Sequence, residues 1–147
     1  MTRLALLAVL AATGCISPIS SKIEVGDEPF ALVVGEGKDG STDLFAVPAA
    51  GGTFRQLTFT RVPEGLPRVA PAANLVAFTR QRSPETVEVV VMNLRVGTEQ
   101  RGALGDDAGT IEALGWSPGG DTVIARTDRG VWSAAIGSKL GFQPAPS

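Results

Sequence analysis

Few residues in this 147-residue chain could carry out catalysis or hold a metal, and the sequence contains no histidine. Serine–histidine and cysteine–histidine catalysis both use an imidazole as the general base. A zinc site without histidine needs several cysteines, whereas Cys15 is the only cysteine of the chain. The residue types therefore predict a protein that is not an enzyme and that uses no metal or organic cofactor.

Two groups of carboxylates have the spacing of turns rather than of cation sites. Asp39 and Asp43 flank Gly40, but the series of Asp or Asn ligands with a terminal Glu that a calcium loop needs is absent. Asp106 and Asp107 lie in a similar glycine-bounded stretch. We interpret both groups as solvated turns. Paired carboxylates for glycoside hydrolysis need only be close in space, so the sequence leaves that chemistry open.

The remaining candidate contacts lie on predicted loops and strands. Arg80, Arg82 and Glu85 are expected on a long loop between two strands, and loops of this kind carry many binding residues. Trp116 and Trp132 fall at strand positions, which favours packing between sheets over ligand binding.

Nucleotide and nucleic-acid binding are both disfavoured. Gly35–Lys38 lacks the spacing of a phosphate-binding loop and is more typical of a hairpin turn. The 13 basic and 15 acidic residues nearly balance and are interspersed along the chain. Such a distribution provides no basic stripe that could follow a phosphate backbone.

The N-terminus has the three-part layout of a secretory signal. Met1–Arg3 is short and positively charged, Leu4–Ala12 is apolar throughout, and the small residues Thr13-Gly14 follow. A helix of that apolar length spans roughly 14 Å at 1.5 Å per residue, against about 30 Å for a bilayer core. Residues 1–14 are therefore predicted to be a signal peptide, with a buried N-terminal helix as the alternative.

Ala12-Thr13-Gly14-Cys15 resembles the bacterial lipobox, although the commonest version has Leu where Ala12 stands. The resemblance implies that Cys15 is lipidated and becomes the first residue of the mature protein. Acyl chains would then hold the protein on a membrane surface, and residues 15–21 would form a tether. In lipoproteins of this kind an Asp after the lipidated cysteine often marks retention in the inner membrane. The residue at that position here is Ile16, so the resemblance favours the outer membrane. A plain secreted signal and a structural cysteine are the alternatives.

The rest of the chain repeats a turn followed by an apolar strand. Trp116–Asp121 precedes the apolar run Thr122–Ala125, and Val69–Asn74 precedes Leu75–Phe78 at an offset of 47 residues. Pro118 presets one turn dihedral, and the two glycines after it are expected to supply positive φ angles. A period of this length is typical of propellers and solenoids.

Further strands follow from the same spacing, at Phe30–Val34, Asp43–Val47, Thr53–Thr58, Glu88–Met92, Thr98–Arg101 and Gly130–Ala134, with a weak one at Lys139–Phe142. The middle strands are almost wholly apolar, as expected when both faces are covered. The last strand of each unit is more polar, as at a rim.

We therefore predict an all-β fold after the N-terminal signal segment. Its architecture is a partial β-propeller of about three four-stranded antiparallel blades, at residues 22–60, 61–105 and 106–143. Residues 144–147 would be a flexible C-terminus. A sandwich or an open meander is the alternative.

Two segments resemble one propeller family. Gly51–Thr58 and Trp116–Asp121 are similar to the TolB-type, WD-repeat-like repeat, whose units carry a Gly-Gly turn, Arg-Gln-Leu-Thr and Trp-Ser-Pro-Asp-Gly. The resemblance covers about residues 22–137 and is weakest in the second unit. It implies a non-catalytic protein-binding or scaffold module of the cell envelope, in the periplasm or on the outer surface. The alternatives are an accessory domain of an envelope hydrolase or peptidase system and a degenerate remnant of a longer propeller lipoprotein.

Three units are fewer than the four to eight blades that usually close a propeller. A homodimer with six blades would meet that number, whereas a three-sheet domain that tolerates its open ends is the alternative. The expected partners are therefore the membrane, through Cys15, a protein of the cell envelope and a second copy of the chain, with no nucleic acid.

Overall fold

The computed structural model describes residues 29–71 and 74–146, which form strands and turns with no helix among them. The strands are β1 (Phe30–Glu36), β2 (Thr42–Pro48), β3 (Arg55–Gln56), β4 (Glu64–Val69), β5 (Leu75–Ser83), β6 (Thr86–Asn93), β7 (Glu99–Ala103), β8 (Ile111–Trp116), β9 (Thr122–Thr127), β10 (Gly130–Ala135) and β11 (Gln143–Pro144). They form three antiparallel sheets: sheet A (β1-β2-β3), sheet B (β4-β5-β6-β7) and sheet C (β11-β10-β9-β8). The predicted all-β class is confirmed. Within the described part of the chain, no segment forms a helix that could span a membrane.

The central hairpin of each sheet has the same pairing. Val33 lies opposite Phe45 in sheet A, and Phe78 lies opposite Val90 in sheet B. The corresponding pair in sheet C is Ala125 with Trp132. Both strands of the hairpin are offset by 45 residues between sheets A and B, and by 47 and 42 residues between sheets B and C. The sequence repeat is thus a repeat of strand pairing.

The turn after β8 has the predicted place but a different glycine geometry. Gly120 has a φ of 72°, whereas Gly119 does not take a positive φ, so one glycine and not two supplies the left-handed conformation. The Ser117 hydroxyl donates to the Asp121 carboxylate at 2.7 Å, and the Gly120 amide donates to the Ser117 carbonyl at 2.9 Å. These bonds close the turn and lead the chain into β9, which pairs with β8.

The outer strands differ most from the prediction. β3 is only two residues long, because the Leu44 amide donates to the Thr58 hydroxyl and not to a backbone carbonyl, which ends the ladder with β2. Lys139–Phe142 does not pair as a strand. Leu140 is 2% exposed and packs on Gly102 of sheet B, where a Cβ would collide with the Leu140 carbonyl oxygen. Packing between sheets therefore takes precedence over pairing in this segment.

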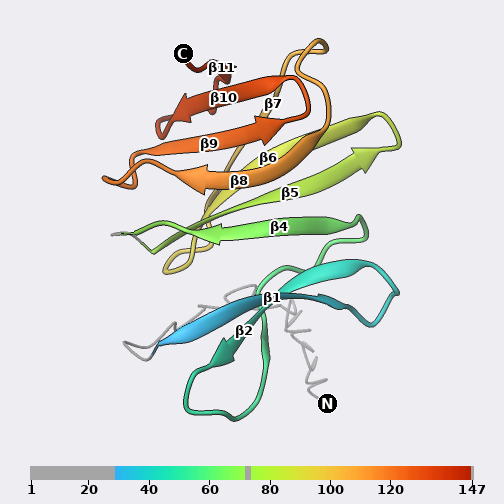
Figure 1. The fold of residues 1–147 in the computed structure, drawn as a ribbon. Coiled ribbons are helices and arrows are strands. Elements are labelled where there is room, and N and C mark those ends of the chain that lie inside the picture. The colour runs from blue at the N-terminus through green and yellow to red at the C-terminus, as the bar shows by residue number, and fades with distance from the viewer. Residues whose placement is uncertain (1–28, 72–73, 147) are drawn as a thin grey trace, which may run out of the picture.

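Sheet B lies between the other two sheets (Figure 1). One hydrophobic cluster joins sheets A and B and contains Leu44, Ala46, Leu57, Val76, Phe78, Val90, Met92 and Leu94. A second joins sheets B and C and contains Ala77, Val89, Val91, Leu114, Val123, Ala125, Ala134 and Leu140. The prediction that middle strands are covered on both faces is confirmed for β5 and β6. It is wrong for β1, where Val33 is 38% exposed, and for β10, where Val131 is 44% exposed, because no described segment covers the outer faces of sheets A and C.

Candidate functional site

A cleft of about 630 Å³ opens where sheet B diverges from sheet C. Three parts of the chain line it: the start of β4, the β5–β6 hairpin, and the connection from β7 to β8. The lining residues are Pro63, Glu64, Gly65, Leu66, Thr79, Gln81, Pro84, Glu85, Thr86, Val87, Ala103, Leu104, Gly105, Asp106, Gly109, Thr110 and Ile111. A concave site between packed elements, reached from loops, is the common setting for ligand binding.

The lining combines apolar side chains with hydroxyl, amide and carboxylate groups. Leu66, Leu104 and Ile111 belong to the edge of the apolar cluster between sheets B and C. The exposed carboxylates Glu85 and Asp106 add negative charge, and none of the lining residues is Lys or Arg. Such a wall can bind an apolar side chain and hydrogen-bond to a peptide backbone or a cationic group.

One residue of the cleft wall has an unfavourable backbone conformation. Leu66 has a φ of 51°, a left-handed value that costs a residue with a side chain about 1–2 kcal/mol. The ladder between β4 and β5 shifts register between Gly65 and Arg68, on either side of this residue. The Leu66 side chain packs against the cluster between sheets B and C, which holds the conformation in place. Backbone strain of this kind gathers at binding sites, which supports the cleft as the candidate site.

A buried ionic cluster lies on the face of sheet B that meets sheet A. Arg80, on β5, is 3% exposed, and its Nε donates to Glu64 Oε1 at 2.8 Å. Its two terminal nitrogens donate to the two carboxylate oxygens of Glu99 on β7, each at 2.8 Å. We call Glu64, Arg80 and Glu99 the Arg80 cluster. The forked guanidinium matches both carboxylates, which gives the geometry of strong charge-assisted bonds.

The crossing from sheet A to sheet B is attached to this cluster. The Thr58 hydroxyl donates to Glu64 Oε2 and accepts the Leu44 amide at 2.9 Å. The amide of Thr60 donates to Asp43 Oδ1 at 3.1 Å, so the same segment also bonds to the start of β2. A chain of hydrogen bonds therefore runs from β2 through the crossing into β4, β5 and β7.

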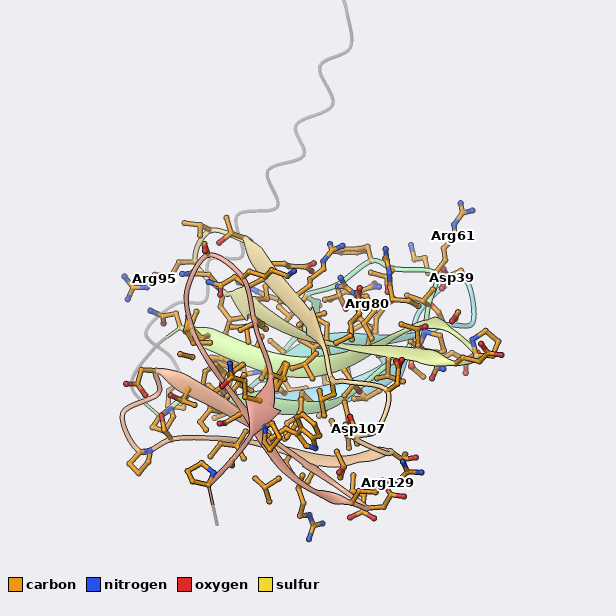
Figure 2. The ribbon with its side chains drawn as sticks, turned by 90° about the horizontal axis from the view of Figure 1, so that it is seen from above. Asp39, Arg61, Arg80, Arg95, Asp107 and Arg129 are labelled. Carbon is orange, nitrogen blue, oxygen red and sulfur yellow. The ribbon has the colours of Figure 1, made fainter. Side chains whose placement is uncertain are left out.

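The charges of the Arg80 cluster stabilise one another. Hydrogen bonds from Arg80 lower the pKa of Glu99 against the opposing effect of burial, and Arg101 lowers it further. Burial disfavours the charged guanidinium of Arg80, but the bonds to Glu99 and Glu64 outweigh that effect and raise its pKa. Both groups are therefore charged at neutral pH. Figure 2 shows Arg80 within the body of the molecule, whereas Arg61, Arg95 and Arg129 lie at its periphery.

The prediction that Arg80, Arg82 and Glu85 lie on a long loop between two strands is wrong. β5 extends to Ser83 and β6 begins at Thr86, so only a tight hairpin turn separates them. Arg80 is a buried structural residue, and Arg82 pairs with Glu88 at 3.5 Å. The polar side chains of this stretch suggested a loop, but they continue the ladder past the apolar core. Only Glu85 of the three lines the cleft.

The two groups of carboxylates that the sequence suggested as turns, Asp39 with Asp43 and Asp106 with Asp107, have different environments. Asp39 is exposed in the hairpin turn, as predicted, but Asp43 is 1% exposed in β2 and so does not belong to a solvated turn. The Gln56 amide donates to its Oδ2 at 2.8 Å, and this bond satisfies one oxygen of the buried carboxylate. Asp106 and Asp107 lie in an exposed turn before β8, in agreement with the sequence, and Asp106 also lines the cleft.

Both tryptophans pack as predicted. Trp116 and Trp132 are partly buried against the cluster between sheets B and C. The Trp116 indole also donates to the carbonyl of Arg68 at 3.0 Å, which links β8 to β4. Gly35–Lys38 leads into the β1–β2 hairpin turn, also as predicted.

The predicted lipidation site, Cys15, lies outside the described residues, as do the signal segment 1–14 and the tether. The sequence gives no indication of the cleft. Its walls come from three segments that are distant along the chain, and no single spacing connects them.

No protein-family model matches this chain, and a search of curated proteins finds no match.

The Arg80 cluster predicts a large loss of stability when its cation is removed. Arg80→Met leaves the fully buried Glu64 without a cation, whereas Glu99 keeps Arg101, and an unpaired buried charge costs about 3–5 kcal/mol. Arg126→Met is the matched control, because its pair with Glu112 is 3.6 Å long and exposed, and such pairs contribute less than about 1 kcal/mol. Chemical denaturation of both variants measures the difference. Equal losses would show that the Arg80 cluster does not stabilise the fold.

Proposed function

We propose that this chain is a membrane-anchored, non-catalytic lipoprotein of the cell envelope, and that its cleft binds a segment of another protein. The cleft between sheets B and C is the observation that carries the proposal. Its mixed apolar and hydrogen-bonding wall suits a peptide segment, and its exposed carboxylates Glu85 and Asp106 suit a basic side chain. The absence of histidine from the full sequence supports binding rather than hydrolysis.

We further propose that the three sheets are blades of a partial β-propeller. The repeated pairing of the central hairpins supports this arrangement, as does the order of strands in sheets B and C. The first strands of these sheets, β4 and β8, contact each other, as innermost strands around a shared axis would. The similarity of Gly51–Thr58 and Trp116–Asp121 to TolB-type repeats points the same way and favours a protein partner.

The anchor in this proposal is Cys15. The charged start, the apolar run and the lipobox-like Ala12–Cys15 support lipidation, and the short stretch 15–21 would keep the folded part close to the membrane. The folded part would then face the periplasm or the outer surface.

Metabolic labelling in a bacterial host tests the anchor. We expect the full chain to incorporate labelled palmitate and to sediment with membranes. Cys15→Ser should abolish both, because the chain has no other cysteine. Equal labelling and equal sedimentation of the two proteins would contradict the anchor without affecting the argument for the cleft.

Photo-crosslinking from the two ends of β6 tests the binding function. A crosslinking amino acid at Thr86 lies in the cleft wall, whereas one at Val96, which is 68% exposed in the turn after β6, lies away from it. In cells, we expect one discrete adduct with another protein from position 86 and none from position 96.

A second substitution shows whether the cleft itself is occupied. Ala103→Arg adds a large cation to the wall and should abolish the adduct from position 86, whereas Val96→Arg should leave it unchanged. An adduct that survives Ala103→Arg, or that forms equally from both positions, would contradict binding in the cleft.

A further inference from the structure

Each sheet has two faces that can be compared through the repeated pairing of the central hairpins. In sheet B, one face carries Val76, Phe78, Val90 and Met92, and we call it the front face. The opposite face carries Ala77, Val89 and Val91, and we call it the back face. Residues at equivalent positions of the central hairpins define the same two faces in sheets A and C. Val33 and Ala125, for example, are equivalent to Phe78 and so lie on the front faces of their sheets.

The two contacts between sheets use these faces in the same order. Leu44 and Ala46, on the back face of sheet A, pack against the front face of sheet B. The front face of sheet C then packs against the back face of sheet B, through Val123, Ala125 and Ala134. Back-to-front packing is therefore a repeated interface and not an accident of one pair of sheets.

This repetition leaves one front face and one back face without a partner among the described residues. The free front face is that of sheet A, with Ala31, Val33, Phe45 and Val47. The free back face is that of sheet C, with Ile124, Val131 and Ser133. Val33 is 38% exposed and Val131 is 44% exposed, so apolar groups that the repeat buries elsewhere face solvent here.

We propose that a second copy of this chain covers both free faces, with the front face of sheet A in each copy packed on the back face of sheet C in the other. The partner is inferred from continuity with the two internal interfaces, which pair the equivalent positions. Heterologous contacts of this kind either close into a ring or extend into a fibre.

The number of copies follows from closure and rests on the propeller arrangement proposed above. Propellers close with about four to eight blades, and only two copies of a three-sheet unit fall within that range. The face-to-face pairing itself does not depend on that number.

The charged groups on the free faces keep their partners when the faces are covered. On the back face of sheet C, Arg126 pairs with Glu112 at 3.6 Å; docking desolvates this exposed pair, which opposes association, but it leaves neither charge alone. On the free front face, Asp43 is already buried and hydrogen-bonded by Gln56 and by the Thr60 amide. The aromatic ring of Phe45 lies over Gly35, where a Cβ would come within 3.1 Å of it.

Solution mass of the full chain in mild detergent tests the proposal. We expect the wild-type protein at tens of micromolar to have twice the protein mass that it has in denaturant. Val33→Arg blocks the front face, and Val131→Arg blocks the back face. Either substitution alone should give monomers, because every contact needs one face of each kind. Val96→Arg is the control, since that exposed turn lies on neither face, and it should leave the dimer intact.

Mixing the two blocked variants tests which faces meet. An equimolar mixture of Val33→Arg and Val131→Arg should recover a weaker heterodimer, because one front face and one back face remain intact. A monomeric wild type would overturn the proposal, as would a dimer that resists both substitutions. Loss of the dimer with only one of them would indicate pairing of like faces, and longer oligomers would indicate an open chain; both results contradict the closed pair. None of these outcomes depends on whether the cleft binds a protein.

Discussion

The structure depends on one constraint: sheet B is apolar on both faces. Phe78 and Val90 project from one face, Val89 and Val91 project from the other, and all four side chains are buried. A sheet of this kind is stable only when other elements cover both sides, as in sheets whose strands are continuous apolar runs. Sheets A and C provide that cover, and each buries its own apolar face in doing so. The order of the three sheets follows from this requirement.

The same constraint explains where binding can occur. Sheets A and C each bury one face, so no described segment covers their other faces, and sheets B and C diverge beyond the packed apolar residues to leave the cleft. The turns and the ends of strands supply the polar groups there. Exposed apolar groups such as Val33 and Val131 on the free faces form the kind of surface that marks interaction sites. The proposed envelope function and the proposed pairing of two copies both use surfaces that the packing of sheet B leaves free.

The sequence predicted the central hairpins well, because β-branched runs such as those around Val76 and Val123 recur at a fixed spacing. It did not indicate β4, where Gly65 and Pro67 obscure the strand pattern and a register shift accommodates them. The burial of Arg80 was also unforeseeable. The equivalent positions in the other sheets are Gly35 and Thr127, so the Arg80 cluster is absent from the repeat and depends on contacts between distant strands.

Hydrogen exchange of the full chain tests the central position of sheet B most directly. Backbone amides that are paired on both sides and covered on both faces open only with large parts of the fold. We expect the slowest exchange in β5 and β6, with faster exchange in β1, which pairs only with β2 among the described strands. Exchange in β5 and β6 as fast as in β1 would contradict it, because the middle sheet would then not be the covered core.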